Sequence, residues 1–196
     1  MTPLQVKRRR LLGAIAAATC LPAVAPAGAH TAAGQVVPAL PAPTLGVTLH
    51  TGRKAEWREL MFGKATAVQL MFTGCSATCP IQGALFAAVQ RQIGTTSAPL
   101  QLISASIDPL GDDAKALQSW LTQFGAGPRW LGLVPGTKEL DPWLDFLRGR
   151  ATGSDKHTAQ VYFFNRRAEL TLRTVDFPRP AEVARLLVQL ATDPAL

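Results

Sequence analysis

The stretch that decides the fold is residues 65–80, ATAVQLMFTGCSATCP, in which a short apolar run leads into two cysteines and a proline. Residues 65–72 are mostly apolar and too few for a typical helix, which indicates a strand buried on both faces of a sheet. Pro80 suits the first position of a helix, because its missing N–H would have no partner there. Residues 80–93 then place an apolar side chain at every fourth position, as one buried helix face requires.

The rest of the chain continues the alternation of strands and helices. The later elements are expected to be a strand at 100–107, a helix at 112–124, a strand at 129–134, a helix at 138–147, strands at 159–164 and 169–175 joined by a hairpin, and a helix at 181–191. Asp112 and Asp113 are both candidate caps for the helix at 112–124. This order predicts a thioredoxin-like α/β fold, a three-layer sandwich with a central mixed sheet.

Composition limits the class of protein. A chain of 196 residues fits one domain, and 47% hydrophobic with 17% charged residues is compatible with a packed core and not with wholesale disorder. Four of the 20 Lys and Arg residues lie at 7–10, and no other charged residue precedes Arg53. The N-terminus therefore supplies four of the seven net positive charges, and we expect no nucleic-acid partner.

Residues 1–29 have the order of a signal peptide, with cations at 7–10, an apolar run at 11–18 and small residues before a cleavage site after Ala29. The arginines also resemble a twin-arginine signal. Either route, Sec or twin-arginine, predicts export to the bacterial periplasm or cell envelope. The Ala- and Pro-rich residues 30–44 are expected to be a flexible linker, and 45–196 the folded domain.

Two other fates of the N-terminus stay open. Cys20 lies in a sequence that weakly resembles a lipoprotein processing site, and an uncleaved segment would act as a membrane tether. Pro22 and Pro26 interrupt this segment, so a cleaved product is favoured over an anchor.

Beyond the predicted signal, Cys75 and Cys79 are the remaining cysteines. The N-terminus of the following helix favours thiolates over thiols. Such a pair either exchanges disulfides or binds a soft metal ion. A structural disulfide is the alternative in an oxidising compartment, but a bond across three residues would constrain the unfolded chain very little.

His157 is the third candidate. In a thioredoxin-like fold the strand at 159–164 runs antiparallel to the strand at 65–72, so its beginning lies beside the end of that strand. This topology predicts that His157 lies next to Cys75 and Cys79. Two thiolates and a neutral imidazole form a trigonal site suited to Cu(I), and the same set approaches neutrality around Cu(II). A plain surface histidine is the alternative, and a structural zinc site would need a fourth ligand that we do not identify.

Other residues are less decisive. Asp108 follows the strand at 100–107, at the sheet edge where ligands bind in α/β folds, and either orients a ligand or partner or begins a turn. Met71 is expected in the core rather than as a metal ligand. Arg148, Arg150 and Lys156 flank the loop before His157, where they either steer an acidic partner or are simply solvated.

Three motifs together resemble the Sco/SenC family: residues 72–80 (FTGCSATCP), residues 106–109 (SIDP) and His157. The resemblance spans about residues 45–191. It implies a thioredoxin-like copper chaperone of the cell envelope that helps to assemble the copper A centre of cytochrome c oxidase, with Cys75, Cys79 and His157 as copper ligands. Residues 76–78 (SAT) depart from the family, which commonly has an acidic residue and a proline there, and this difference concerns the client more than the metal site.

Two functions follow from these residues. The first is a monomeric metallochaperone that gives copper to a respiratory oxidase subunit, or to another copper enzyme, by ligand exchange. The second is an enzyme, a thiol–disulfide oxidoreductase in which Cys75 attacks a partner disulfide and Cys79 resolves the product. Residues 156–159 (KHTA) lack the proline that thioredoxins place beside their cysteines, which argues against a general reductase.

Overall fold

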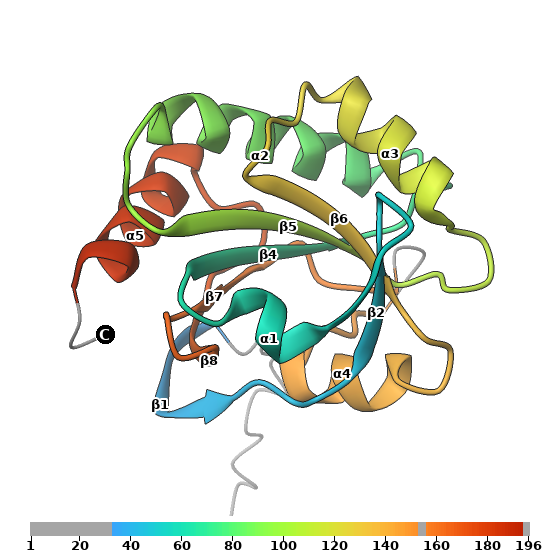
Figure 1. The fold of residues 1–196 in the computed structure, drawn as a ribbon, viewed down its shortest axis with the longest axis horizontal. Helices are drawn as coiled ribbons and strands as arrows, with labels where there is room; N and C mark the ends of the chain where they lie inside the picture. The colour runs from blue at the N-terminus through green and yellow to red at the C-terminus, as the bar shows by residue number, and fades with distance from the viewer. Residues whose placement is uncertain (1–32, 153–155, 194–196) are drawn as a thin grey trace, which may run out of the picture.

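The computed structural model describes residues 33–152 and 156–193. The predicted signal peptide and residues 30–32 of the predicted linker lie outside this range. Eight strands form one mixed sheet in the order β1-β8-β7-β4-β5-β6-β2-β3, with helices on both faces (Figure 1). The elements are β1 (Gly34–Pro41), β2 (Gly46–Leu49), β3 (Lys54–Glu56), α1 (Trp57–Met61), β4 (Ala65–Met71), α2 (Thr78–Ile93), β5 (Leu100–Ser106), α3 (Ala114–Gln123), β6 (Trp130–Pro135), α4 (Leu140–Leu147), β7 (Val161–Phe164), β8 (Glu169–Arg173) and α5 (Pro180–Thr192).

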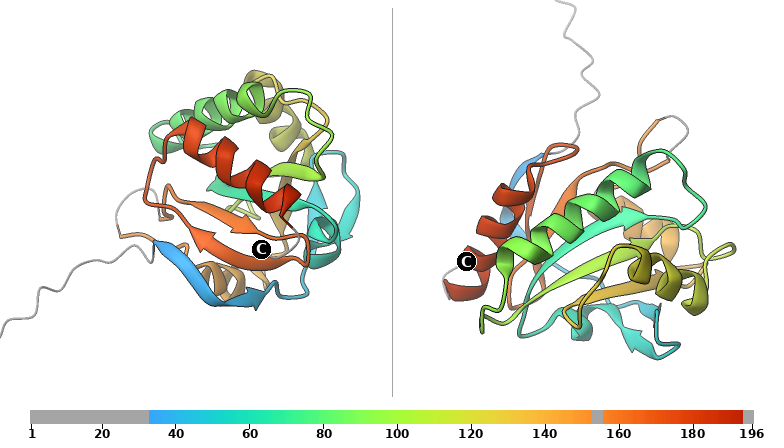
Figure 2. Two further views of the ribbon diagram at one scale, coloured as in Figure 1. Left: turned by 90° about the vertical axis from the view of Figure 1, so that its left-hand side faces the viewer. Right: turned by 90° about the horizontal axis from the view of Figure 1, so that it is seen from above.

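The central strand β4 is buried on both faces, as its apolar run predicts. All seven of its residues are buried, and successive side chains alternate between two cores. Ala65 and Ala67 face the core made with α2, α3 and α5, whereas Val68 and Leu70 face the core made with α1 and α4. On the first face α2 and α5 lie side by side (Figure 2). The predicted three-layer α/β architecture is therefore confirmed.

Strand pairing gathers several chain segments at one edge of the sheet. β4 runs parallel to β5, with Met71 opposite Ser106, and antiparallel to β7, with Gln69 opposite Val161. The end of β4 therefore lies beside the end of β5 and the beginning of β7. The cysteine loop, the turn after Ser106 and the segment that holds His157 all lie at this edge.

The expectation of a flexible linker over residues 30–44 is wrong for Gly34–Pro41. These residues form β1, which pairs antiparallel with β8, with Gln35 opposite Leu172 and Leu40 opposite Leu170. β1 covers the backbone groups of β8 that would otherwise form an open sheet edge. Its prolines are compatible with this position, because proline is tolerated on an edge strand.

The first helix and the second and third strands were not expected from the sequence. β2 pairs with both β3 and β6, and α1 follows β3 directly, capped by the Glu56 side chain. Trp57 of α1 is fully buried against Trp143 of α4 and Phe164 of β7, with edge-on ring contacts. In residues 33–152 and 156–193, no helix combines the length and the apolar character that crossing a membrane would need.

Candidate functional site

The cysteine loop connects β4 to the N-terminus of α2. This helix begins at Thr78, with Ala77 as its N-cap residue and no hydrogen bond from a capping side chain. The Cys79 N–H instead donates to Cys75 Sγ, with 3.4 Å between nitrogen and sulfur. Helix N-termini leave backbone N–H groups without intrahelical partners, and an oxygen side chain usually accepts from them. Here the Cys75 sulfur takes that role.

This contact explains the ionisation of Cys75. Burial raises the pKa of the Cys75 thiol, but hydrogen bonds from the Cys79 backbone and side chain and from the backbone N–H groups of Ala77 and Thr78 outweigh it. The pKa therefore lies below its ordinary value. Cys75 is half-buried and Cys79 is fully buried. A partner protein would therefore contact Cys75 before Cys79. The lowered pKa favours the thiolate of Cys75, which is the form that reacts and binds metal ions.

The structure places His157 beside Cys79, as the topology predicts. His157 is only 2% exposed, and its Nε2 lies 3.7 Å from Cys79 Sγ. Its Nδ1 lies 2.9 Å from the Thr158 carbonyl oxygen. Because a carbonyl only accepts hydrogen bonds, Nδ1 must carry the proton, and in the neutral ring Nε2 then presents its lone pair. The Phe72 ring packs edge-on against the imidazole, with 6.1 Å between ring centroids.

The spacing of Cys79 and His157 suits a shared metal ion. An ion about 2.3 Å from a thiolate sulfur and about 2.1 Å from an imidazole nitrogen, the bond lengths typical of zinc, would separate these atoms by about 3.8 Å at a trigonal angle. The observed 3.7 Å agrees with that value. The proton on Nδ1 also fixes the tautomer that a metal ligand needs. In the part of the chain that the structure describes, no three His, Cys, Asp or Glu side chains are already grouped as a metal site.

Asp112, one of the two candidate helix caps, instead supports the cysteine loop. Its buried carboxylate accepts a hydrogen bond from Thr73 N at 3.0 Å, a second from the Thr73 hydroxyl and a third from Ser106 Oγ at 2.6 Å. These bonds join the start of the cysteine loop to the end of β5. The cap of α3 is the neighbouring Asp113, whose carboxylate accepts from Ala116 N at 2.8 Å.

Asp108 closes a turn. Its carboxylate accepts from Gly111 N at 3.0 Å, and its own N–H donates to Ser106 Oγ at 3.0 Å. Of the two interpretations given above, these bonds favour the turn over direct contact with a ligand. Asp108 therefore contributes to the site through the position of the loop that carries Asp112.

The remaining candidates lie away from the sulfurs or in the core. Met71 is fully buried, as expected for a packing residue. Arg150 forms ion pairs with Asp141 at 2.6 Å and Asp145 at 3.0 Å, which offset its charge. His50, the other histidine of the described residues, accepts a hydrogen bond at Nδ1 from Gly132 N at 3.2 Å.

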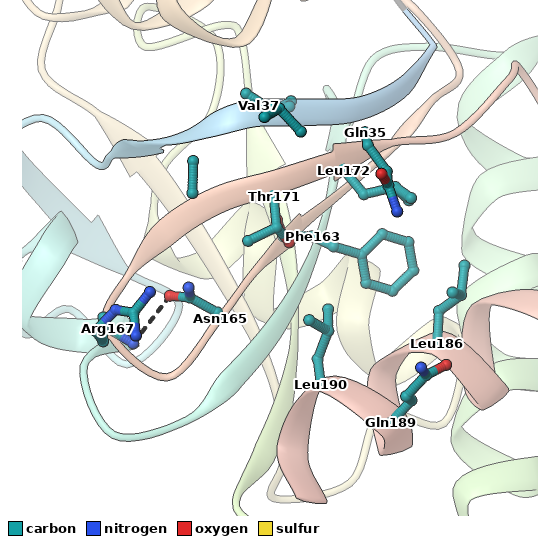
Figure 3. A pocket seen from close by; sticks show the side chains of 12 residues that line it. Gln35, Val37, Phe163, Asn165, Arg167, Thr171, Leu172, Leu186, Gln189 and Leu190 are labelled. Atoms are coloured by element: carbon teal, nitrogen blue, oxygen red, sulfur yellow. Dashed lines mark hydrogen bonds between the residues drawn. The ribbon is translucent and has the colours of Figure 1, made fainter. Parts of the chain in front are cut away.

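A cavity of 330 Å³ lies elsewhere, between α5 and strands β1, β7 and β8 (Figure 3). The Phe163 ring lies on the sheet side of this cavity and Leu190 on the helix side, and Arg167 lies at one end. Ligand pockets are often apolar cavities of about this size. Among the described residues that line it there is no Cys, His, Asp or Glu.

Comparisons with known proteins agree with this fold. The family model for SCO1/SenC matches residues 46–191. A SCO1/SenC family lipoprotein from Bacillus anthracis superposes with a TM-score of 0.67 at 18% identity, covering 78% of this chain and 95% of that one. ScoI from Bradyrhizobium japonicum with copper bound superposes with a TM-score of 0.63 at 22% identity, covering 75% of this chain and 97% of that one. Yeast Sco1 with copper bound superposes with a TM-score of 0.66 at 16% identity, covering 80% of this chain and 92% of that one.

The comparison with curated proteins finds no match. At the identities above, the structural likeness establishes the thioredoxin-like fold, and the family model covers most of the chain. The chain belongs to the SCO1/SenC family.

Proposed function

We propose that the protein is a copper metallochaperone of the bacterial cell envelope. In this proposal Cys75, Cys79 and His157 hold one copper ion, which is cargo for the copper A site of a respiratory oxidase. The observation that carries the proposal is the 3.7 Å spacing of Cys79 Sγ and His157 Nε2 beside a thiol of lowered pKa. The copper-bound structures of two relatives support the choice of metal.

The chemistry of the three side chains supports copper over harder ions. Thiolates and imidazole are the ligands that Cu(I) prefers, whereas magnesium and calcium prefer oxygen. Two thiolates and a neutral imidazole give a net charge of −1 with Cu(I) and of zero with Cu(II). Cys79 and His157 are buried and therefore shielded from water, whereas Cys75 is half-buried. Solvent and partner proteins would thus reach the site at Cys75.

Loading and release would both involve Cys75. Its sulfur accepts hydrogen bonds from the Cys79 N–H and from the Cys79 side chain, so it already lies beside one of the other two proposed ligands. The same half-buried thiolate is the ligand that an acceptor protein reaches first. Transfer would then proceed by ligand exchange, in which an acceptor thiolate or imidazole replaces Cys75 before Cys79 and His157 dissociate from the ion.

A thiol–disulfide oxidoreductase is the second candidate, and the lowered pKa of Cys75 favours it. The Cys75 thiolate would attack one sulfur of a partner disulfide, forming a mixed disulfide and expelling a partner thiolate. Cys79 would then lose its proton to His157 Nε2 and attack Cys75, which releases the second partner thiol and leaves a Cys75–Cys79 disulfide. A reductant, such as a second dithiol protein, would be needed to restore the starting state.

Competitive Cu(I) titration against a bathocuproine chelator separates the two functions. The variants are Cys75→Ser, Cys79→Ser and His157→Ala, and His50→Ala is the matched control, because His50 pairs with the backbone of β6. Loss of an outer-shell partner typically costs about 10–100-fold in metal affinity, so loss of His157, a direct ligand, should cost more. Unchanged Cu(I) affinity in His157→Ala, together with full disulfide reductase turnover, would favour the oxidoreductase.

A further inference from the structure

Exposed apolar side chains lie on the chain segments next to the cysteine–histidine site. Ile81 is 56% exposed, Leu110 86%, Val175 61% and Phe177 46%. Large apolar side chains that stay together in solvent mark interaction surfaces more often than single scattered ones do. We call these four residues the apolar rim.

Chain position and hydrogen bonds connect three segments of the apolar rim to the site. Ile81 follows Cys79 by two residues in the first turn of α2. Leu110 lies in the turn that ends at Asp112, the residue bonded to Thr73 at the start of the cysteine loop. Phe177 donates its N–H to the Ala159 carbonyl, 3.1 Å away and two residues after His157. Three segments that are distant in sequence thus bring apolar groups to the sheet edge that holds the sulfurs.

The apolar rim carries little charge. No residue of 72–82 is charged. The ionisable side chains in the neighbouring segments 107–111, 156–159 and 174–178 are Asp108, Lys156, Asp176 and His157. Asp108 accepts from Gly111 N at 3.0 Å, and Asp176 accepts from Ala159 N at 2.8 Å, so both carboxylates serve loops of this chain. A partner that covered this face with charged side chains would bury charges without compensation.

Exchange at Cys75 requires close approach. An acceptor atom must come within bonding distance of a half-buried sulfur, and that approach removes water from the loop and from the apolar rim around it. Removal of apolar surface from water stabilises the encounter and depends little on salt. A partner steered by charge would instead associate at a rate that falls steeply as ionic strength rises.

We propose that the apolar rim is the docking surface for the protein that exchanges ligands or sulfur with Cys75, and that this partner presents its own thiols on an uncharged, apolar loop. The inference rests on the proposed function in one respect, namely that Cys75 is the point of exchange. It goes further in assigning the chemistry of the partner, which is neutral and apolar around the donor atoms.

The test uses synthetic peptides as the partner and a readout that does not involve copper. Each peptide carries an intramolecular Cys-Ser-Ser-Ser-Cys disulfide, flanked on both sides by Leu-Phe, by Lys-Lys or by Asp-Asp. In a Cys79→Ser background, Cys75 attacks the peptide disulfide, a mixed disulfide forms and one peptide thiolate is released. The trapped mixed disulfide is measured over time in 50 and 500 mM NaCl.

The rim variant combines Ile81→Ser, Leu110→Ser and Phe177→Ser. The matched control combines Val37→Ser, Leu40→Ser and Phe62→Ser, which are exposed apolar residues on β1 and at the opposite end of β4. The rim variant should trap the Leu-Phe peptide about tenfold more slowly or worse, since each buried apolar side chain contributes on that scale. The control should keep the parent rate, and neither salt concentration should change the preference for the Leu-Phe peptide.

Equal trapping by the rim variant and its parent would overturn the proposal, as would a preference for a charged peptide that disappears in 500 mM NaCl. Unfolding in urea shows whether the rim variant remains folded, and a single substitution, Leu110→Ser, repeats the comparison at the most exposed position. Failure of the copper proposal appears separately, as absence of Cu(I) binding by the unaltered protein, and does not alter the trapping result.

Discussion

Asp112→Asn should destabilise the protein far more than the same substitution at the adjacent residue. The Asp112 carboxylate is buried and accepts from Thr73 N, the Thr73 hydroxyl and Ser106 Oγ. Hydrogen bonds to charged groups contribute about 1.5–3 kcal/mol each, and neutral ones about 0.5–1.5 kcal/mol. An asparagine can keep three bonds if the hydroxyl that faces its amide nitrogen turns to accept, but each bond loses its charge assistance.

The loss is therefore about 1 kcal/mol for each bond and about 3 kcal/mol in total. Asp113→Asn is the matched control, because Asp113 is exposed and asparagine caps a helix as well as aspartate does. Its free energy of unfolding should stay within about 0.5 kcal/mol of the parent value. Urea unfolding measures both variants, and hydrogen exchange at Thr73 N reports whether the cysteine loop loosens. A free energy for Asp112→Asn that equals the control would refute the role assigned to this carboxylate.

Three further predictions test other features. Gln82→Leu should raise the free energy of unfolding by about 1–3 kcal/mol, because neither polar atom of this buried amide has a partner among the described residues; a less stable variant in urea would contradict this. The lowered pKa of Cys75 means that its stabilising effect is present above the unfolded pKa and lost as pH falls through the folded pKa. The stability difference between the parent and Cys75→Ser should thus widen as pH rises toward 9, and a flat difference would argue against the thiolate. Deletion of residues 34–41 should cost at least about 2 kcal/mol through lost β1–β8 hydrogen bonds, whereas a linker would cost nothing.

The sequence predicted the parts of the fold that local pattern controls. The apolar run at 65–72 and the spacing of four in residues 80–93 correspond to β4 and α2 to within two residues. Strand order then predicted that His157 lies beside Cys79, because the pairing of β4 with β7 follows from the thioredoxin-like connection. A contact between residues that are far apart in sequence was predictable here because topology alone determines it.

Other features depend on contacts that no local pattern encodes. β1 has prolines and mostly exposed side chains, and it is a strand because β8 offers it an edge. Asp112 and Asp113 are chemically identical neighbours, and only the packed structure shows which carboxylate points toward Thr73 and which caps α3. The capping of α2 by a sulfur was likewise unexpected, because oxygen side chains usually accept from the first helical N–H groups.

X-ray absorption at the copper edge on the Cu(I)-loaded protein counts the sulfur and nitrogen ligands of the ion. We expect two sulfur neighbours and one nitrogen neighbour, with the nitrogen lost in His157→Ala and retained in His50→Ala. A copper ion with only sulfur neighbours in the unaltered protein, or a nitrogen signal that persists without His157, would contradict this expectation.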